Sequence, residues 1–316
     1  MPPPMARVLV TDPIHDSGVQ LLRKEHEVVV EELDAVALPR AMAGYEALVV
    51  RSRTKVTREV LSAGGRLKVV GRAGVGVDNV DTAAAKELGI AIVNAPTAAT
   101  NAVAELAVGH ALALARGIAR LDGAMRQGRW EKKGSEGWEL AGKTLGLVGV
   151  GRIGSRVAEL ARAFGMRALA YDPYVSADAA RRMNVEKVDS LERLLEDADV
   201  VSVHVSLTPE TKGLLDGKRI ALMKRTAILL NLSRGGVVDE PALAMALESG
   251  AIAGAGLDVF STEPLAPDSP LARLPNVILT PHVGANSREA QAAAGRIVAE
   301  QVLKVLRGET ADFRVV

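Results

Sequence analysis

The sequence of 316 residues contains no cysteine. This absence excludes disulfide bonds, zinc held by thiolates and a cysteine nucleophile. The chain also has little net charge, because 39 Lys and Arg residues stand against 38 Asp and Glu residues, giving +1. A field this weak attracts neither nucleic acid nor an anionic membrane, so we expect neither as a partner and any basic site must be local.

Targeting and membrane-spanning patterns are also missing. The first residues, "MPPPMARVLV", hold one Arg and then a strand pattern, without the apolar segment and cleavage site of a signal peptide. The longest apolar segment, residues 102–119, is interrupted by Glu105, His110 and Arg116 and falls short of a membrane span. We therefore expect a cytoplasmic protein in which this segment is a buried or interfacial helix.

Short apolar runs rich in β-branched residues alternate with helical patterns along the chain, which predicts an α/β fold of doubly wound parallel sheets. Length and a hydrophobic content of 48% favour two domains. The strands fall into two series. Five are predicted at 7–12, 26–31, 46–52, 67–74 and 90–95, and six at 142–151, 167–172, 199–205, 226–232, 254–260 and 276–282.

Two helical segments follow these two series. Residues 100–128 are apolar at helical period and are predicted to form one helix capped by Thr100 or Asn101. Residues 286–308 are predicted to form a second helix, capped by Asn286 or Ser287 and ended by Gly308, that packs back onto the first domain. The expected architecture is a six-stranded domain, residues 97–286, inserted into a five-stranded domain of residues 1–96 and 287–316.

A glycine motif indicates a dinucleotide site in the second domain. "LGLVGVGRIG" places Gly149, Gly151 and Gly154 in the G-x-G-x-x-G spacing between a strand and a helix. Asp172 ends the next strand, 18 residues after the last glycine, where its carboxylate can accept hydrogen bonds from both ribose hydroxyls. Since no Arg adjoins Asp172, NAD is favoured over NADP. A glycine turn without a nucleotide remains the alternative.

Polar residues follow three later strands of the second domain, at the edge where a doubly wound sheet binds ligands. These residues are Arg234, then Asp258 and Glu263, then His282. For NAD-linked oxidation of a secondary alcohol, His282 supplies the base, Glu263 orients its ring and Arg234 grips a carboxylate. Structural roles in turns or in the core remain alternatives for each. His204 is the rival base, and His110 is interpreted as a satisfied buried histidine.

In the first domain, Arg51 and Arg53 follow the third strand, and Arg72 follows the fourth. The amides of the glycine turn at Gly74 and Gly76 can receive a carboxylate. Three arginines at one sheet edge, in a chain of net charge +1, favour a strongly anionic substrate. Solvated arginines on surface loops are the alternative.

The chain resembles the D-isomer-specific 2-hydroxyacid dehydrogenases, and within them the branch that oxidises 3-phosphoglycerate to 3-phosphohydroxypyruvate in serine synthesis. The resemblance covers nearly the whole chain, through "VRSRTKVT", "GRAGVGVDNVD", "GKTLGLVGVGRIG", "GLLDGKRIALMKRTAILLNLSRGGVVDE", "GLDVFSTEP" and "PHVGANSREAQ". It implies a Rossmann NAD-binding domain inserted into a flavodoxin-like substrate-binding domain.

The resemblance also implies site residues. Arg234, Glu263 and His282 form the catalytic set. NAD is expected on Val75, Gly149, Gly151, Arg152, Ile153, Gly154, Asp172, Val205, Leu232, Ser233, Arg234, Asp258, His282, Gly284 and Ala285. The substrate is expected on Arg51, Ser52, Arg72, Ala73, Gly74, Asn101, Arg234, His282 and Lys132 of the partner subunit, in a homodimer formed through residues 100–140. No metal is expected.

The chain departs from the family pattern at Val75, where relatives often carry a hydroxyl residue, and at Ser206, where many carry Pro. Because the sequence ends at Val316, no C-terminal serine-binding regulatory domain is expected. Alternatives are a glyoxylate or hydroxypyruvate reductase, another D-2-hydroxyacid dehydrogenase, or, remotely, a corepressor-like protein that senses NAD. Formate dehydrogenases pair the histidine with Gln, so Glu263 argues against them.

Overall fold

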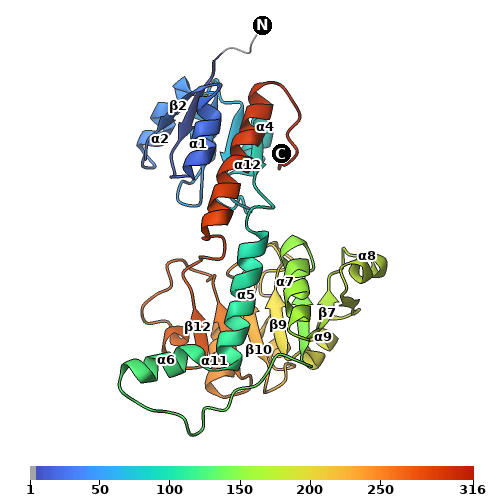
Figure 1. Ribbon diagram of the computed structural model, residues 1–316. Helices are drawn as coiled ribbons and strands as arrows, with labels where there is room; N and C mark the ends of the chain where they lie inside the picture. The colour runs from blue at the N-terminus through green and yellow to red at the C-terminus, as the bar shows by residue number, and fades with distance from the viewer. Residues whose placement is uncertain (1–4) are drawn as a thin grey trace. The chain divides into compact units, whose positions relative to one another are not determined.

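The computed structural model of the protein describes residues 5–316. The chain divides into two compact units (Figure 1). Unit 1 combines the residues up to Thr100 with Ala285–Val316, and unit 2 comprises Asn101–Gly284. Both units are parallel α/β sheets, which confirms the predicted fold class.

Unit 1 contains a five-stranded sheet in the order β2-β1-β3-β4-β5, which is the flavodoxin-like order. Its strands are β1 Arg7–Val10, β2 Glu27–Val30, β3 Ala47–Val50, β4 Val69–Arg72 and β5 Ala91–Asn94. Its helices are α1 Asp16–Arg23, α2 Ala37–Ala41, the 3-10 helix η1 Met42–Gly44, α3 Arg58–Ala63, α4 Thr82–Glu87 and α12 Arg288–Leu306.

Alternating strand residues of unit 1 point to opposite faces of the sheet, and each face is covered by a hydrophobic core. Leu48 and Val70 pack into a core with Leu38 of α2, whereas Val49 and Val69 pack into the opposite core with helix α12. Figure 1 shows α12 beside α1, far from it in sequence, and the two helices are in contact. Ser287 caps α12, as predicted, by accepting a hydrogen bond from the amide of Ala290.

Unit 2 contains a seven-stranded parallel sheet in the order β12-β11-β10-β9-β6-β7-β8. Its strands are β6 Thr144–Val148, β7 Arg167–Tyr171, β8 Glu186–Lys187, β9 Val200–Val203, β10 Ile228–Asn231, β11 Gly254–Leu257 and β12 Val277–Leu279. The prediction of six strands was wrong by one. The missed strand, β8, has two residues at the sheet edge, too few to show a hydrophobic period.

The helices of unit 2 begin with α5 Thr100–Ala115 and α6 Ile118–Arg126 and continue with α7 Arg152–Ala163, α8 Ala177–Arg182, α9 Leu191–Asp197, α10 Gly217–Ile220, α11 Glu240–Glu248 and the 3-10 helix η2 Pro270–Arg273. The single helix predicted over residues 100–128 was wrong. Gly117, with φ of 60°, interrupts it, and α5 and α6 are bent by 64°. In residues 5–316 no single helix could cross a membrane, although this bent pair passes on length and composition.

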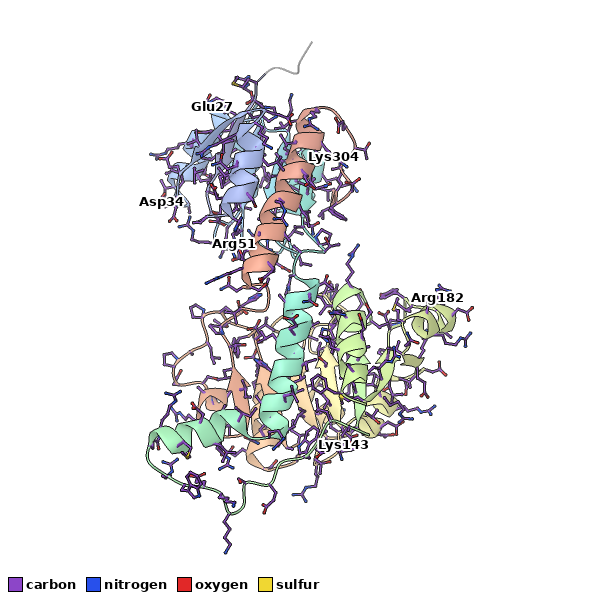
Figure 2. The ribbon with its side chains drawn as sticks, viewed as in Figure 1. Glu27, Asp34, Arg51, Lys143, Arg182 and Lys304 are labelled. Atoms are coloured by element: carbon purple, nitrogen blue, oxygen red, sulfur yellow. The ribbon has the colours of Figure 1, made fainter. Side chains whose placement is uncertain are left out.

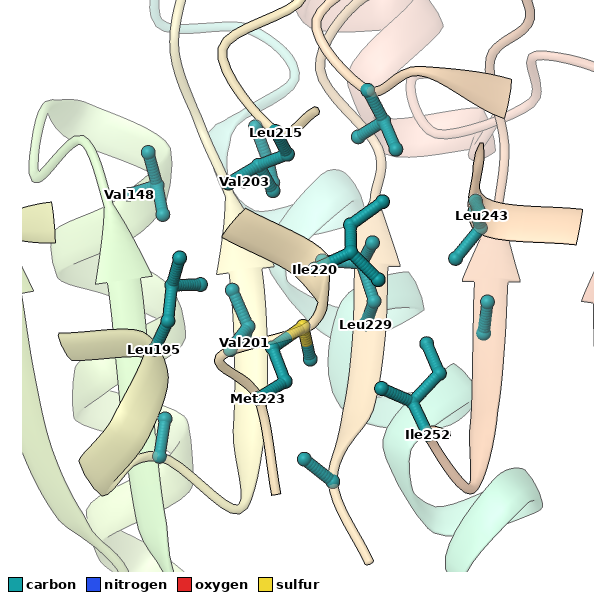
Figure 3. Close-up of a cluster of buried hydrophobic side chains, with 14 of the residues drawn as sticks. Val148, Leu195, Val201, Val203, Leu215, Ile220, Met223, Leu229, Leu243 and Ile252 are labelled. Carbon is teal, nitrogen blue, oxygen red and sulfur yellow. The ribbon is translucent and has the colours of Figure 1, made fainter. Parts of the chain in front are cut away.

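The core of unit 2 fixes the strand ends on which the site depends. Leu195 of α9 packs with Val148, Val201 and Val203 against one face of the sheet (Figure 3). Leu195 and Val203 are completely buried. Because β6 and β9 are neighbours where the strand order reverses, this cluster holds the two strands that flank the expected ligand crevice.

We expect Leu195→Ala to lower the free energy of unfolding by roughly 2–5 kcal/mol, because it removes buried methyl groups and leaves a cavity. Leu207→Ala, at a site that is 43% exposed, is the matched control and should change it by less than about 0.5 kcal/mol. Urea unfolding of the three proteins measures both effects. Equal losses in the two variants would contradict this assignment of the core.

Candidate active site

The glycine loop connects β6 to α7. Gly149 has φ of 90°, and a Cβ on Gly154 would lie 2.5 Å from the carbonyl oxygen of Gly149. Gly151 stands before the first residue of α7, and no side chain caps this helix. A Cβ on Gly151 would meet no atom within 4 Å. The loop therefore leaves open space beside the amide groups of a helix N-terminus, the geometry that receives a phosphate.

Asp172 follows β7 and contacts the glycine loop. One carboxylate oxygen accepts a hydrogen bond from the amide of Val150 at 3.0 Å, and the other accepts one from the amide of Tyr174 at 2.9 Å. Each oxygen has a second lone pair that can accept from a ribose hydroxyl. The loop, the uncapped helix and this carboxylate fit the pyrophosphate and adenine-side ribose of NAD.

The other residues expected to contact NAD follow strands of the two sheets or open helix α7. Arg152 and Ile153 open α7, Val205 follows β9, Leu232 and Ser233 follow β10, and Gly284 and Ala285 follow β12. Val75 follows β4 in unit 1, where its carbonyl oxygen accepts a hydrogen bond from Asn94 Nδ2 at 2.6 Å.

His282 and Glu263 form a hydrogen-bonded pair. His282 follows β12, Glu263 follows β11, and these strands are neighbours. His282 Nδ1 lies 2.8 Å from Glu263 Oε2, while Glu263 Oε1 accepts a hydrogen bond from the amide of Phe260 at 3.1 Å. Since a carboxylate only accepts, Nδ1 carries the proton and Nε2 is left to exchange one with a ligand. The side chain of His282 is 49% exposed.

Arg234 lies on the loop after β10, the neighbour of β11. Its Nη1 donates to the carbonyl oxygen of Ser233 at 2.7 Å. Asn231, the buried last residue of β10, holds this loop: its Nδ2 donates to Arg234 O, and its Oδ1 accepts from the amide and hydroxyl of Ser233. The sequence reading missed Asn231, although a polar residue ending a buried strand was the available signal.

Asp258 is buried and binds the turn that carries His282. Its carboxylate accepts hydrogen bonds from the hydroxyl of Thr280 at 2.6 Å and from the amides of Val283 and Gly284 at 2.9 and 2.8 Å. His282 itself has φ of 52°, which a residue with a side chain seldom adopts. Asp258, expected as a cofactor contact, thus also fixes the backbone of this turn.

The other two histidines of unit 2 are in different surroundings. Burial lowers the pKa of His204 to about 4, and its Nε2 lies 2.8 Å from Ser202 Oγ. A base so weak is neutral at pH 7 and is held by a core serine. His110, in α5, was interpreted as a satisfied buried histidine, but its Nδ1 has no partner among residues 5–316.

In unit 1, the buried carboxylate of Asp12 organises the loop after β3. It accepts hydrogen bonds from the amide of Arg51 at 2.7 Å, from the amide and hydroxyl of Thr54, and from Arg53 Nε at 3.0 Å. Burial raises the pKa of Asp12 and the bonds from Thr54, Arg51 and Arg53 lower it, with a net lowering. Arg53 also forms an ion pair with Glu32, which follows β2. Both of these carboxylate partners of its guanidinium lie within unit 1.

The remaining substrate candidates of unit 1 lie beside this loop. Arg51 Nη1 donates to the carbonyl oxygen of Pro13 at 3.3 Å, and Arg51 lies at the same end of the unit as the start of α12 (Figure 2). Ser52 follows Arg51. Arg72 ends β4, and its guanidinium lies against Gly74, where a Cβ would come within 1.5 Å of Nη1. Ala73 is buried between them.

Two further candidates lie in the 100–140 region. Asn101 is in the first turn of α5, where its Oδ1 accepts a hydrogen bond from Arg156 Nε of α7 at 2.9 Å. Lys132 is exposed in the segment between α6 and β6. Neither makes a described contact with Arg234, Glu263 or His282.

Comparisons with known proteins point to one family. The family model described as "D-isomer specific 2-hydroxyacid dehydrogenase, NAD binding domain" matches residues 108–284. The chain is 50% identical to D-3-phosphoglycerate dehydrogenase of Methanocaldococcus jannaschii, over 98% of this chain but 59% of that protein. It is 45% identical to hydroxypyruvate reductase of Thermotoga maritima, over 95% and 98% of the two chains.

A solved structure, the TT0316 protein of Thermus thermophilus, superposes with a TM-score of 0.89 at 40% identity and covers 98% of this chain and 100% of that one. The chain therefore belongs to the D-isomer specific 2-hydroxyacid dehydrogenase family, and unit 2 contains the NAD-binding domain of that family. The resemblance seen in the sequence motifs is confirmed. The chain spans well under two thirds of the length of the first phosphoglycerate dehydrogenases it matches.

We expect Gly151→Ala to raise the Kd for NADH by about tenfold or more, because the new methyl group occupies the space that the pyrophosphate needs. The melting temperature should not change, since this Cβ meets no protein atom. Gly109→Ala, in α5, has equally open space and should leave both quantities unchanged. Isothermal titration with NADH tests this, and wild-type affinity in Gly151→Ala would exclude the loop as the phosphate site.

Proposed function

We propose that the protein catalyses the NAD-dependent oxidation of D-3-phosphoglycerate to 3-phosphohydroxypyruvate, the first step of serine biosynthesis. The observation that carries the reaction type is the 2.8 Å hydrogen bond between His282 and Glu263 on neighbouring strand ends of an NAD-binding domain. The substrate is proposed from the arginine-bearing loops of unit 1 and from relatives named D-3-phosphoglycerate dehydrogenase at 45–50% identity.

In this proposal His282 and Glu263 handle the proton. Nε2 of His282 removes the hydroxyl proton of the substrate, and the Glu263 carboxylate stabilises the imidazolium that forms. NAD, held by the glycine loop and Asp172, would supply the acceptor for the hydride on the carbon that bears this hydroxyl, so that the alcohol becomes a ketone. In the reverse direction the imidazolium returns the proton to the carbonyl oxygen.

Arginine side chains bind the anionic groups of the substrate. The guanidinium of Arg234 presents a planar fork that grips a carboxylate and polarises the adjacent carbonyl. Arg51 and Arg72 bind the phosphate or the carboxylate, with Ser52 and the backbone at Ala73 and Gly74 beside them. Asn101 of the same chain and Lys132 of the partner subunit complete the set. We propose that the reaction takes place in the cytoplasm.

Reduction of an unphosphorylated acid is the second candidate. It is supported by hydroxypyruvate reductase of Thermotoga maritima, a relative whose length this chain covers to 98% at 45% identity. Both reactions use the same acid and base. The two substrates differ in the phosphate group, which adds negative charge for the arginine side chains to bind.

We also propose a homodimer formed through residues 100–140. Helix α6 and the segment after it expose large apolar side chains, Ile118, Met125 and Trp130, and Trp130 is 77% exposed. Exposed apolar side chains gathered on one segment are typical of a surface that another chain covers. A second copy would also deliver its Lys132.

The substrate is tested by following NADH consumption with 3-phosphohydroxypyruvate, hydroxypyruvate and glyoxylate under identical conditions. A hydrogen bond to a charged phosphate contributes roughly 1.5–3 kcal/mol. We therefore expect kcat/KM to favour the phosphorylated acid by at least tenfold. Equal or higher kcat/KM for an unphosphorylated acid would reject this substrate and favour the reductase.

We expect His282→Asn to lower kcat by roughly 10² to 10⁴, the range associated with general acid–base catalysis. His204→Asn is the matched control and should leave kcat close to that of the wild type. If His282→Asn turns over at a near-normal rate while His204→Asn does not, the proton role belongs to His204.

The dimer is tested by sedimentation velocity of the wild type and of Met125→Lys combined with Ile118→Lys. We expect a dimer of 33.1 kDa chains in the wild type and a monomer in the double variant, because buried unpaired charges are costly. A control double variant, Met245→Lys with Leu222→Lys, places the same charges on exposed sites elsewhere in unit 2. A monomeric wild type would contradict the proposal.

A further inference from the structure

His110 is a buried imidazole to which the proposed mechanism gives no role. It lies in α5 and is 3% exposed. Its Nε2 is 3.4 Å from Thr280 Oγ1, whereas its Nδ1 has no partner among the described residues. The ring lies against Gly256 of β11, where a Cβ would come within 2.8 Å of Nδ1. Because that strand has no side chain at this point, the ring can reach the end of β12.

The hydrogen bonds around Thr280 have one consistent direction. The Asp258 carboxylate only accepts, so the Thr280 hydroxyl proton is donated to Asp258 Oδ1 at 2.6 Å. Thr280 Oγ1 can then only accept from His110, which requires the proton of His110 on Nε2. Nδ1 is left unprotonated, which agrees with its lack of a partner. Burial lowers the pKa of His110 against the opposing effect of the Asp258 charge, so the ring is neutral.

The hydrogen bonds that run from His110 through Thr280 end on Asp258, the residue that holds the turn of His282. Asp258 binds the amides of Val283 and Gly284, and its own carbonyl oxygen accepts a hydrogen bond from the amide of His282 at 2.8 Å. The turn holds His282 at φ of 52°, so it needs several such bonds to keep that conformation. A shift of Asp258 would therefore move the ring of His282 relative to Glu263.

We propose that His110 is a positioning residue for the proton carrier: as a neutral Nε2–H donor, it fixes Thr280 and Asp258, which hold the turn of His282. The inference rests on the proposed function, because it assigns the role of positioning to residues behind the acid–base pair. Helix α5, through His110, would then help to position His282, and all of the contacts involved lie inside unit 2.

The test is a double-mutant cycle with His110→Phe and Thr280→Val, which remove the donor and the hydroxyl but keep similar volumes. We expect each to lower kcat for reduction of 3-phosphohydroxypyruvate by roughly 10- to 100-fold, with KM for NADH unchanged. In the double variant kcat should fall no further than in either single variant, because both substitutions break the same series of hydrogen bonds. His110→Gln, which keeps an N–H donor of similar reach, should restore most of kcat.

His26→Phe is the matched control, because His26 is also a buried histidine with an unpartnered ring nitrogen, in unit 1. It should leave kcat unchanged even if it lowers the melting temperature. Wild-type kcat in His110→Phe, additive losses in the double variant, or no rescue by Gln would each overturn the inference.

The ¹⁵N NMR shifts of the histidine rings give a readout that needs no turnover. We expect His110 to be a neutral Nε2–H tautomer at pH 7, and the Nδ1 shift of His282 to change in Thr280→Val. Protonation of His110 on Nδ1, or an unchanged His282 shift, would contradict the inference even if a variant folds poorly. If the wild type reduces none of the three acids, the proposed function fails while these shifts still decide the role of His110.

Discussion

The buried carboxylate of Asp258 joins the parts of unit 2 on which the site depends. It follows β11, and it binds the hydroxyl and the two amides of the segment after β12. A buried carboxylate is destabilised when any of its hydrogen-bond donors is removed. The turn of His282 is therefore set by the strand that also leads to Glu263, and the hydrogen-bonded pair of His282 and Glu263 is built from two neighbouring strand ends.

The sheet order explains why the remaining groups gather at the same edge. In unit 2 all seven strands are parallel, so the segments after β6, β7, β10, β11 and β12 leave from one edge. The glycine loop, Asp172, Arg234, Glu263 and His282 all follow such ends. In unit 1, Asp12 plays a role similar to that of Asp258, because its carboxylate holds the arginine-bearing loop through amides and Arg53.

The sequence was sufficient for the fold class, for eleven of the twelve strands, and for the family. Apolar runs such as 226–232 lie on fully buried parallel strands, where a continuous hydrophobic pattern is the expected signal. The break at Gly117 was missed, because apolar residues continue at helical period on both sides of it. The two-residue strand β8 was missed because its pairing depends on β7, not on its own sequence.

Side-chain partners were harder to predict than elements. Asn231 bonds its neighbours Ser233 and Arg234, and its place at the end of a buried strand was the signal that could have found it. By contrast, the residue that holds the loop of Arg51 is Asp12, which lies 39 residues away in the chain. The partner of His110 was missed for the same reason: helical period predicts that the ring is buried, as it is, but its partner Thr280 is 170 residues away.

The proposed proton carrier is His282, on the turn held by Asp258. The most direct measurement is a crystal structure with NAD and D-3-phosphoglycerate. We predict that Nε2 of His282 lies within hydrogen-bond distance, about 2.6–3.2 Å, of the hydroxyl on the carbon next to the carboxylate, with Arg234 on that carboxylate. A hydroxyl bound instead to His204, or a carboxylate away from Arg234, would contradict the account.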